Sequence, residues 1–304
     1  MLKRNMFAIG AIAISALLSV TPLAHAGDPL STSTPRSNSD TIVVGSADFP
    51  ESQLLAKIYA LALGAKGMKV DTKLNIGSRE VYMPALLDGS IDLIPEYAGA
   101  TLSYLDKSAT AHAPQDVIDA LAKVLPKGIS MLKASDAQDS DVLAVTEDTA
   151  KKYSLTSIED LKPVAGQLVL GGPPEWKTRK EGVVGLREVY GLEFKDFKTL
   201  DVAGPLTLSA LTNGQVDAAD MTSTDPAMKG NKLVALKDTK NLFPAQNIVP
   251  IIAAAKVDDK VTAVLNAVSA ALTTEDLIEM NGRLANQESF DTVAGDWLAK
   301  NKLN

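Results

Sequence analysis

Residues 74–105 read LNIGSREVYMPALLDGSIDLIPEYAGATLSYL and contain one complete run of loop, helix, turn and strand. Apolar residues at helical spacing from Val81 onward predict a short helix that ends at Gly89. The apolar run 91–94 then predicts a buried strand that stops at Pro95. This alternation is typical of an open α/β sheet, in which ligands bind beyond the carboxyl ends of the strands.

The loops on either side of this unit therefore hold the first candidates for ligand contact. Ser78 and Arg79 precede the predicted helix, and Tyr97 follows the predicted strand. All three are expected at the edge of the sheet where a ligand binds.

The same unit occurs twice in the chain. Residues 85–92 (ALLDGSID) and 210–217 (ALTNGQVD) share the pattern A-L-x-x-G-x-(I/V)-D, and strand-like segments at 42–46 (IVVGS) and 168–172 (LVLGG) recur at nearly the same offset. Two matching pairs in the same order indicate two similar α/β lobes.

The first 26 residues have the features of a secretory signal peptide. Lys3 and Arg4 precede an apolar run at 6–20, and Ala24-His25-Ala26 offers a cleavage site. The chain has no cysteine, so a lipid anchor at the cleavage site is not expected. Residues 27–40 are rich in Ser, Thr, Pro and Asp and predict a disordered leader. No later stretch is long and apolar enough to span a membrane, which favours a free periplasmic protein.

The charge of the remaining chain is acidic. The signal peptide holds two of the 30 Lys and Arg and none of the 37 Asp and Glu, so the mature protein has a net charge of −9. Binding to nucleic acid requires a basic surface and is not expected.

Two crossings between the lobes are predicted. The composition turns polar at 136–140, and an apolar, proline-flanked segment at 243–250 reads as the return. One lobe would then comprise 41–136 plus 247–304, and the other 137–246. The segment 257–303 is expected to be helical and to pack on the first lobe.

The sequence offers little for catalysis or cofactor binding. His112 is the single histidine after the signal peptide, and its Ala-His-Ala-Pro setting suggests a surface loop. A zinc site or a Ser–His–Asp triad needs more than this. Neither a P-loop nor a G-x-G-x-x-G motif is present, so neither an enzyme nor a nucleotide cofactor is expected.

Aromatic residues are scarce, at 5% of the chain, yet several fall in loops expected at the ligand edge. Phe49, Tyr97, Trp176 and Phe243 are the candidates. Aromatic faces attract alkylammonium cations and stack on flat apolar ligands. Phe49 and Phe243 have an equally plausible role as core residues, whereas Trp176 lies in a polar loop where burial is less natural.

Arg79 and Arg179 each follow a glycine-containing loop after a strand. An arginine in that position can clamp a carboxylate with two hydrogen bonds, and the alternative is a solvated surface side chain. Asp225 precedes Pro226 and either caps a turn or faces the ligand.

As a set, these segments resemble the ProX/OpuC type of solute-binding protein, including its OsmF-like branch. The resemblance covers nearly all of 41–304 in order and rests on Gly45-Ser46-x-x-Phe49-x-Glu51-Ser52, Asn75-Ile76-Gly77-Ser78, Pro95-Glu96-Tyr97-x-Gly99, Arg179-x-x-Gly182, Ser223-Thr224-Asp225, Phe243-Pro244 and the two repeat units.

The resemblance implies an α/β, two-lobe periplasmic binding protein of type II, a Venus flytrap with a mixed sheet in each lobe. Such receptors close on glycine betaine, choline or a related quaternary amine and deliver it to an ABC permease. It implies a small-molecule ligand, permease subunits as partners, and a monomer.

The family holds the ammonium group in a box of tyrosines, and this chain departs from that pattern. Tyr97 matches one box tyrosine and Arg179 the family arginine, but the other box positions fall on Asp141, Thr222 and Gln246. The family lysine falls on Ala47, and the threonine after the tyrosine falls on Ala100. Asp141 or Asp225 could replace tyrosines by pairing with the cation, and Trp176 could supply a ring.

Nine residues are predicted to bind the ligand: Phe49, Ser78, Arg79, Tyr97, Trp176, Arg179, Thr222, Asp225 and Gln246. Tyr97 is expected to pack on the ligand and Arg179 to bind its anionic end. One alternative is a receptor of the same architecture for a non-betaine solute, polar or aromatic. An enzyme on the same two-lobe scaffold is the alternative from a different functional class.

Overall fold

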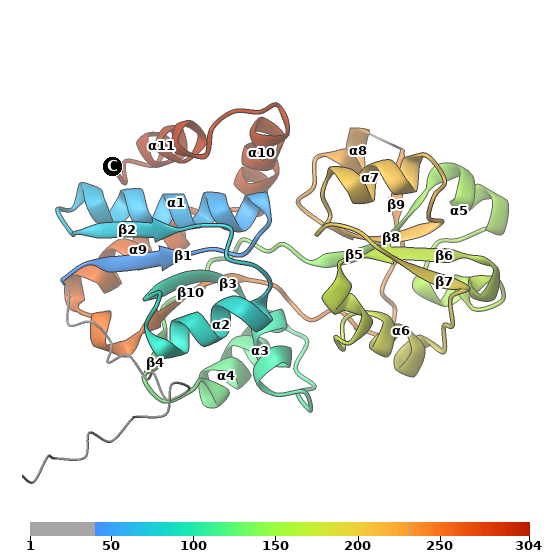
Figure 1. The fold of residues 1–304 in the computed structure, drawn as a ribbon, viewed down its shortest axis with the longest axis horizontal. Coiled ribbons are helices and arrows are strands. Elements are labelled where there is room, and N and C mark those ends of the chain that lie inside the picture. The colour runs from blue at the N-terminus through green and yellow to red at the C-terminus, as the bar shows by residue number, and fades with distance from the viewer. Residues whose placement is uncertain (1–39, 231) are drawn as a thin grey trace, which may run out of the picture. The chain divides into compact units, whose positions relative to one another are not determined.

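The computed structural model describes residues 40–230 and 232–304. The predicted signal peptide and all but the last residue of the predicted leader lie outside the described residues. The described strands form two five-stranded mixed sheets, each flanked by helices (Figure 1).

The first sheet has the strand order β2-β1-β3-β10-β4. β1 pairs in parallel with β2 and β3, whereas β10 is antiparallel to β3 and β4. The strands are β1 Ile42–Gly45, β2 Val70–Lys73, β3 Leu93–Tyr97, β4 Ile129–Met131 and β10 Ile248–Ala253.

The second sheet repeats this arrangement with the order β7-β6-β8-β5-β9. β6 pairs in parallel with β7 and β8, and β5 is antiparallel to β8 and β9. Its strands are β5 Asp141–Thr146, β6 Val169–Gly172, β7 Asp196–Thr199, β8 Ala218–Thr222 and β9 Leu233–Ala235. The antiparallel inner strand of each sheet, β10 in the first and β5 in the second, is thus the strand that follows directly after the chain passes over from the other sheet.

The helices between the strands are amphipathic or buried. The α-helices are α1 Pro50–Ala65, α2 Arg79–Asp88, α3 Ala98–Leu105, α4 Pro114–Val124, α5 Glu147–Tyr153, α6 Val183–Tyr190, α7 Pro205–Thr212, α8 Ala227–Gly230, α9 Asp259–Ala271, α10 Thr274–Ala285 and α11 Phe290–Lys300. Short 3-10 helices are η1 Ile158–Leu161, η2 Ala165–Gln167, η3 Pro174–Lys177 and η4 Ala254–Lys256.

The repeat found in the sequence has a structural cause in its final aspartate. Asp92 accepts a hydrogen bond from the Val43 backbone N–H (3.0 Å) and donates its own N–H to the Val43 carbonyl (2.7 Å). Asp217 makes the same pair of bonds with Val169, at 2.8 Å each. In both copies, therefore, one aspartate joins the segment just before a strand (β3 or β8) to the parallel neighbouring strand (β1 or β6).

The glycine of the repeat's first strand is required by packing. A Cβ on Gly45 would lie 2.5 Å from a methyl group of Ile91, and one on Gly171 would lie 3.1 Å from Val216. Ile91 and Val216 are the β-branched residues just before the two repeat aspartates. The two halves of the repeat therefore fit each other sterically as well as through hydrogen bonds.

The C-terminal helices cover α1, as expected for 257–303. The buried cluster on that side of the first sheet combines residues of α1 with Val261, Leu265, Trp297 and Leu298. Among the described residues, no single helix is long and apolar enough to cross a membrane, and α9 with α10 passes that test only as a pair bent by 87°.

Two local predictions around Tyr97 are wrong. The strand does not stop at Pro95, because β3 continues to Tyr97 and Pro95 lies opposite Pro250 of β10. Neither proline can donate, so the pair occupies a position of the antiparallel ladder that needs no N–H from either residue. Tyr97 is not in a loop, since it is the last residue of β3 and α3 begins directly at Ala98.

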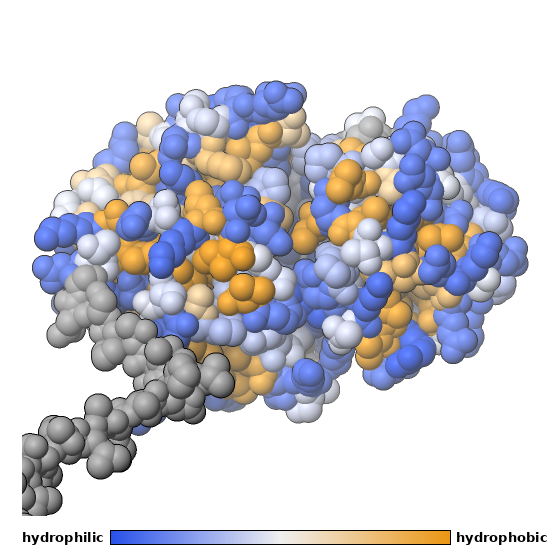
Figure 2. Space-filling model, in the orientation of Figure 1, coloured by the Kyte–Doolittle hydropathy of each residue, from blue (hydrophilic) through white to orange (hydrophobic). Residues whose placement is uncertain are grey.

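The surface shows apolar residues as small patches separated by hydrophilic side chains on the face in Figure 2. The exposed large hydrophobic side chains of the described residues are Leu61, Val81, Leu87 and Leu206. Scattered apolar side chains of this kind are normal on a protein surface.

Candidate functional site

A buried carboxylate, Glu51, connects the parts of the chain that carry the two sheets. Phe49 is the N-cap of α1 and Pro50 its first residue, which places Glu51 in the first turn, where the helix dipole favours a negative charge. The Glu51 side chain is only 4% exposed. Its burial means that each oxygen needs a hydrogen-bond donor.

Three neutral donors satisfy Glu51. Tyr97 at the end of β3 donates its hydroxyl to Oε1 (2.8 Å). Thr224, in the loop after β8, donates its hydroxyl to Oε2 (2.7 Å), and Asn281 of α10 donates its side-chain amide to the same oxygen (2.6 Å). None of these partners carries a positive charge, so the charge of Glu51 is not compensated by its hydrogen-bond partners.

A second buried carboxylate, Asp139, lies beside this network. Its Oδ1 accepts from the Thr224 backbone N–H (3.0 Å) and the Ser223 hydroxyl (3.2 Å). Its Oδ2 accepts no hydrogen bond in the described part of the chain and is accessible to solvent, although the residue as a whole is only 6% exposed. Burial and the nearby charge of Glu51 hold the pKa of Asp139 well above its ordinary value.

These carboxylates face a cavity of about 730 Å³. Ligand sites in proteins commonly have this size and a mainly apolar lining with a few polar groups. The cavity is lined by Phe49, Pro50, Glu51, Asp139, Val202, Ala203, Gly204, Pro205, Leu208, Thr222, Asp225, Pro226, Ala227, Asn281, Gly282, Leu284, Ala285, Asn286 and Gln287. Three of these described lining residues are carboxylates and none is Lys, Arg or His.

Three of the nine predicted residues line this cavity: Phe49, Thr222 and Asp225. Tyr97 lies directly behind them, with its ring 5.8 Å from that of Phe49. Asp225 combines both roles considered for it, because its Oδ1 accepts from the Ala227 backbone N–H (2.7 Å) while the residue also lines the cavity. Burial raises the pKa of Asp225.

Arg79 clamps a carboxylate, but one of the protein itself. Its Nε donates to Oε1 of Glu96 (3.0 Å) and its Nη2 to Oε2 (2.8 Å). The two side chains are 7% and 0% exposed. Ser78 is the N-cap of α2, and its carbonyl accepts from the Val81 and Tyr82 N–H groups. The structure thus gives both residues intramolecular partners.

Arg179 makes an ion pair between the segments of the two sheets. It follows η3 and donates Nε to Oε1 of Glu80 (3.2 Å) and Nη2 to Oε2 (2.9 Å), and Glu175 lies 3.8 Å away. For Glu80, burial raises the pKa, but the hydrogen bonds from Arg179 and Ser78 outweigh it and lower the pKa to about 2.

The expectation that Trp176 is not a core residue is wrong. Its side chain is 1% exposed and stacks on Phe243 with ring centroids 6.5 Å apart and planes 10° apart. Gly182 explains the close packing, since a Cβ there would lie 2.0 Å from the Trp176 carbonyl oxygen. The polar residues next to Trp176 belong to the 3-10 helix η3, and the Trp176 side chain packs into the core.

Gln246 holds the return crossing against α3. Its side chain is buried, and Oε1 accepts from the Ala100 backbone N–H (2.9 Å). Gly99 lies beneath the same segment, because a Cβ on it would be 2.6 Å from Pro244 and 2.7 Å from the Ala245 carbonyl. The Tyr97-x-Gly99 motif therefore keeps the crossing close to β3.

Two more carboxylates occupy the edge of the second sheet. Asp141 lies directly opposite Thr222 in the β5–β8 ladder, and burial together with the charge of Glu181 raises its pKa to about 6. Burial also raises the pKa of Asp220, whose Oδ1 has no hydrogen-bond partner among the described residues. Asp141, which the resemblance aligns with a box tyrosine, therefore lies on the strand next to the one that carries Asp220.

The sequence did not single out Glu51, Asp139, Thr224 and Asn281 as site residues. Glu51 and Thr224 belong to motifs that carried the family resemblance, so a signal was present for them. Asp139 and Asn281 had none, because their role arises only when distant segments meet.

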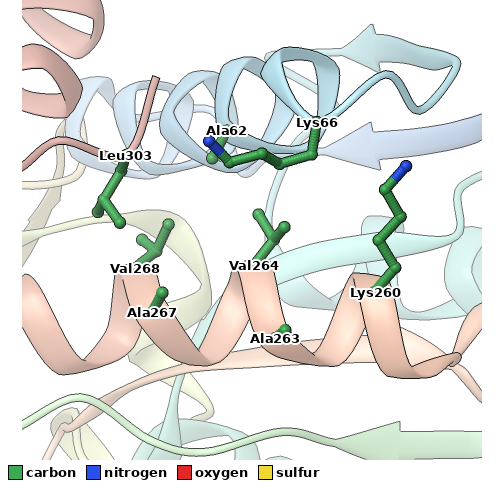
Figure 3. A pocket seen from close by; sticks show the side chains of 8 residues that line it. All are labelled: Ala62, Lys66, Lys260, Ala263, Val264, Ala267, Val268 and Leu303. Atoms are coloured by element: carbon green, nitrogen blue, oxygen red, sulfur yellow. The ribbon is translucent and has the colours of Figure 1, made fainter.

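A second cavity, of about 400 Å³, lies between α1 and α9 (Figure 3). It is lined by Ala62, Lys66, Lys260, Ala263, Val264, Ala267, Val268 and Leu303. None of the predicted site residues lines it, and Lys66 donates to the backbone oxygen of Asn304. Across the described residues, no group of three or more His, Cys, Asp or Glu side chains is arranged to hold a metal.

Comparison with known proteins identifies the family. The model of the substrate-binding domain of ABC-type glycine betaine transport systems matches residues 40–300. The chain is 28% identical over 281 residues to a carnitine transport binding protein of Listeria monocytogenes, covering 87% of this chain and 88% of that protein.

It is also 28% identical over 227 residues to a glycine-betaine-binding protein of Pseudomonas aeruginosa, covering 70% and 71% of the two chains. The crystal structure of a glycine betaine/carnitine/choline ABC transporter protein matches the fold with a TM-score of 0.69 at 22% identity, over 86% of this chain and 99% of that one. The chain has the periplasmic binding protein fold, and it belongs to the family of substrate-binding domains of ABC-type glycine betaine transport systems.

Proposed function

We propose that this protein is the solute receptor of an ABC importer and that it binds glycine betaine, choline or a related quaternary amine. The observation that carries the proposal is the family match over residues 40–300. The relatives named above, a carnitine transport binding protein and a glycine-betaine-binding protein, support the same ligand class.

The cavity supports the proposal because it has the chemistry that a methylated ammonium group needs. Phe49 offers an aromatic face, which contributes about 0.5–2 kcal/mol of cation–π attraction. Glu51, Asp139 and Asp225 supply negative charge around it. Tyr97 acts behind this surface, where its hydroxyl fixes Glu51.

The lobes in this proposal are 41–136 plus 247–304 and 137–246, which join at two crossings. Glu51–Thr224 and Glu80–Arg179 are hydrogen-bonded pairs that join residues of the two lobes. The receptor would close on its ligand in this way, act as a periplasmic monomer, and deliver the ligand to permease subunits without catalysing a reaction.

A non-betaine solute is the second candidate. It is favoured by the three positions, Asp141, Thr222 and Gln246, at which the resemblance leads one to expect aromatic side chains. Gln246 in particular is turned toward α3 and away from a ligand role.

A thermal-shift screen tests the proposed function. The full chain is expressed, purified from the periplasm, and melted with glycine betaine, choline, carnitine, glycine and phenol. A ligand at about 100 times its Kd stabilises the fold by roughly 2.7 kcal/mol, which a melt resolves. At least one methylated amine should raise Tm while glycine does not. A shift with phenol and none with any quaternary amine would support the second candidate.

A further inference from the structure

The cavity contains negative charge that no basic side chain offsets. Glu51 and Asp139 are both less than one-tenth exposed, and their hydrogen-bond partners are hydroxyl, amide and backbone N–H groups. Asp225 adds a third carboxylate, and the described residues that line the cavity include no Lys, Arg or His.

The two arginines of the site region are already paired. Arg79 is held by both oxygens of Glu96, and Arg179 by both oxygens of Glu80. A ligand carboxylate in the cavity would therefore find no free guanidinium and would face Glu51 and Asp139. Burying a second anion beside buried carboxylates is unfavourable, whereas a cation there compensates their charge.

One atom of the cavity also requires a donor. Oδ2 of Asp139 accepts no hydrogen bond from the described residues and is accessible to solvent, so a ligand that displaces water there must replace the hydrogen bond that the water made. A quaternary ammonium group has no N–H, so a ligand that satisfies this oxygen must bring a hydroxyl or another polar hydrogen.

We infer that the cavity selects a ligand with a net positive charge, a hydroxyl-type donor and no carboxylate, so that choline is preferred to glycine betaine and carnitine. The inference rests on the proposed function and narrows it. Asp139 sets the preference. A bound cation offsets the burial and the charge of Glu51 that raise the pKa of Asp139, and its Oδ2 is open to the ligand hydroxyl. Asp225, which also lines the cavity, adds to the preference.

Calorimetric titration with choline and glycine betaine tests this inference. The two ligands share the trimethylammonium group and differ at the other end, where one has a hydroxyl and the other a carboxylate. The wild-type full chain should bind choline at least tenfold more tightly, a difference of about 1.4 kcal/mol.

Two variants remove one charge each and keep the acceptor oxygen that bonds to the backbone. Both Asp139→Asn and Asp225→Asn should weaken choline binding by at least fivefold. In Asp139→Asn, the preference for choline over glycine betaine should also fall below threefold. Glu193→Gln removes a charge from an exposed loop outside the cavity and should leave both affinities unchanged.

The outcomes separate the inference from the proposed function. Glycine betaine binding as tightly as choline overturns the inference and leaves the proposed function standing. An unchanged preference in Asp139→Asn overturns the assignment to that residue. Binding of a protonated primary amine such as ethanolamine, with no binding of any quaternary amine, overturns the proposed function and keeps the charge selection. Failure of all these amines to bind overturns both.

Discussion

The buried pair of Arg79 and Glu96 gives the most decisive prediction about the roles of charged residues in this site. Arg79 was expected at the ligand, but its guanidinium makes two short hydrogen bonds to Glu96, and Oε2 of Glu96 also accepts from the Tyr97 backbone N–H (3.1 Å). Removing the arginine leaves a fully buried carboxylate without a cationic partner. Breaking a buried ion pair from one side costs about 3–5 kcal/mol.

The variant Arg79→Met keeps the length of the side chain and removes its charge. Urea unfolding should show a loss of about 3–5 kcal/mol in the free energy of unfolding. The double variant Arg79→Met with Glu96→Gln should recover at least about 1 kcal/mol, because the buried charge is gone. Arg187→Met is the control: its side chain is 57% exposed and 3.8 Å from Glu188, so its effect should stay within about 0.5 kcal/mol.

The affinity for ligand discriminates between the two roles of Arg79. Folded Arg79→Met protein should bind its ligand with an unchanged Kd when measured below the unfolding transition. A stability change under about 1 kcal/mol combined with a large loss of affinity would show that the guanidinium serves the ligand, and would refute the reasoning.

Three further predictions concern packing, protonation and the repeat. Gly99→Ala should destabilise by more than about 2 kcal/mol because its Cβ would overlap the return crossing, whereas Gly64→Ala, with nothing within 4 Å in α1, should stabilise by about 0.5–1 kcal/mol in thermal melts. Burial raises the pKa of Asp141 to about 6, above the unfolded value near 3.9, so the free energy of unfolding should rise as pH falls from about 6 toward 4. Asp141→Asn should flatten that rise, and an unchanged pH profile would contradict the assignment. Asp92→Ala and Asp217→Ala each remove the bond to the first strand of their sheet and should each cost about 1–3 kcal/mol in urea unfolding, with a loss below about 0.5 kcal/mol at both positions counting against the shared role.

Much of the fold could be predicted from the sequence because its elements carry local signals. The helix predicted from Val81 to Gly89 is α2, and the strand-like segments at 42–46 and 168–172 are β1 and β6. The repeat of glycine, β-branched residue and aspartate could be recognised in the sequence because each of these residues makes a specific contact in both copies.

The failures of prediction arise where tertiary contacts override local signals. Pro95 reads as a strand end, but a facing proline in β10 lets the strand continue. Trp176 reads as exposed from its polar neighbours, but its indole fills the core next to Phe243.

The site was predicted less completely than the fold. Phe49, Thr222 and Asp225 do line one cavity, and Tyr97 lies behind it. Arg79 and Arg179 have protein carboxylates as partners, which sequence cannot reveal because the pairs are 17 and 99 residues apart. The absence of a basic partner for Glu51 and Asp139 became visible only once their neutral hydrogen-bond donors were known.

The most direct test of the central claim is a crystal structure of the full chain grown with choline. The account predicts electron density for one choline molecule in the cavity of about 730 Å³, with its ammonium group within about 6 Å of the Phe49 ring centroid and its hydroxyl within hydrogen-bond distance of Asp139. Density for the amine beside Trp176 and Arg179, with this cavity filled only by water, would contradict it.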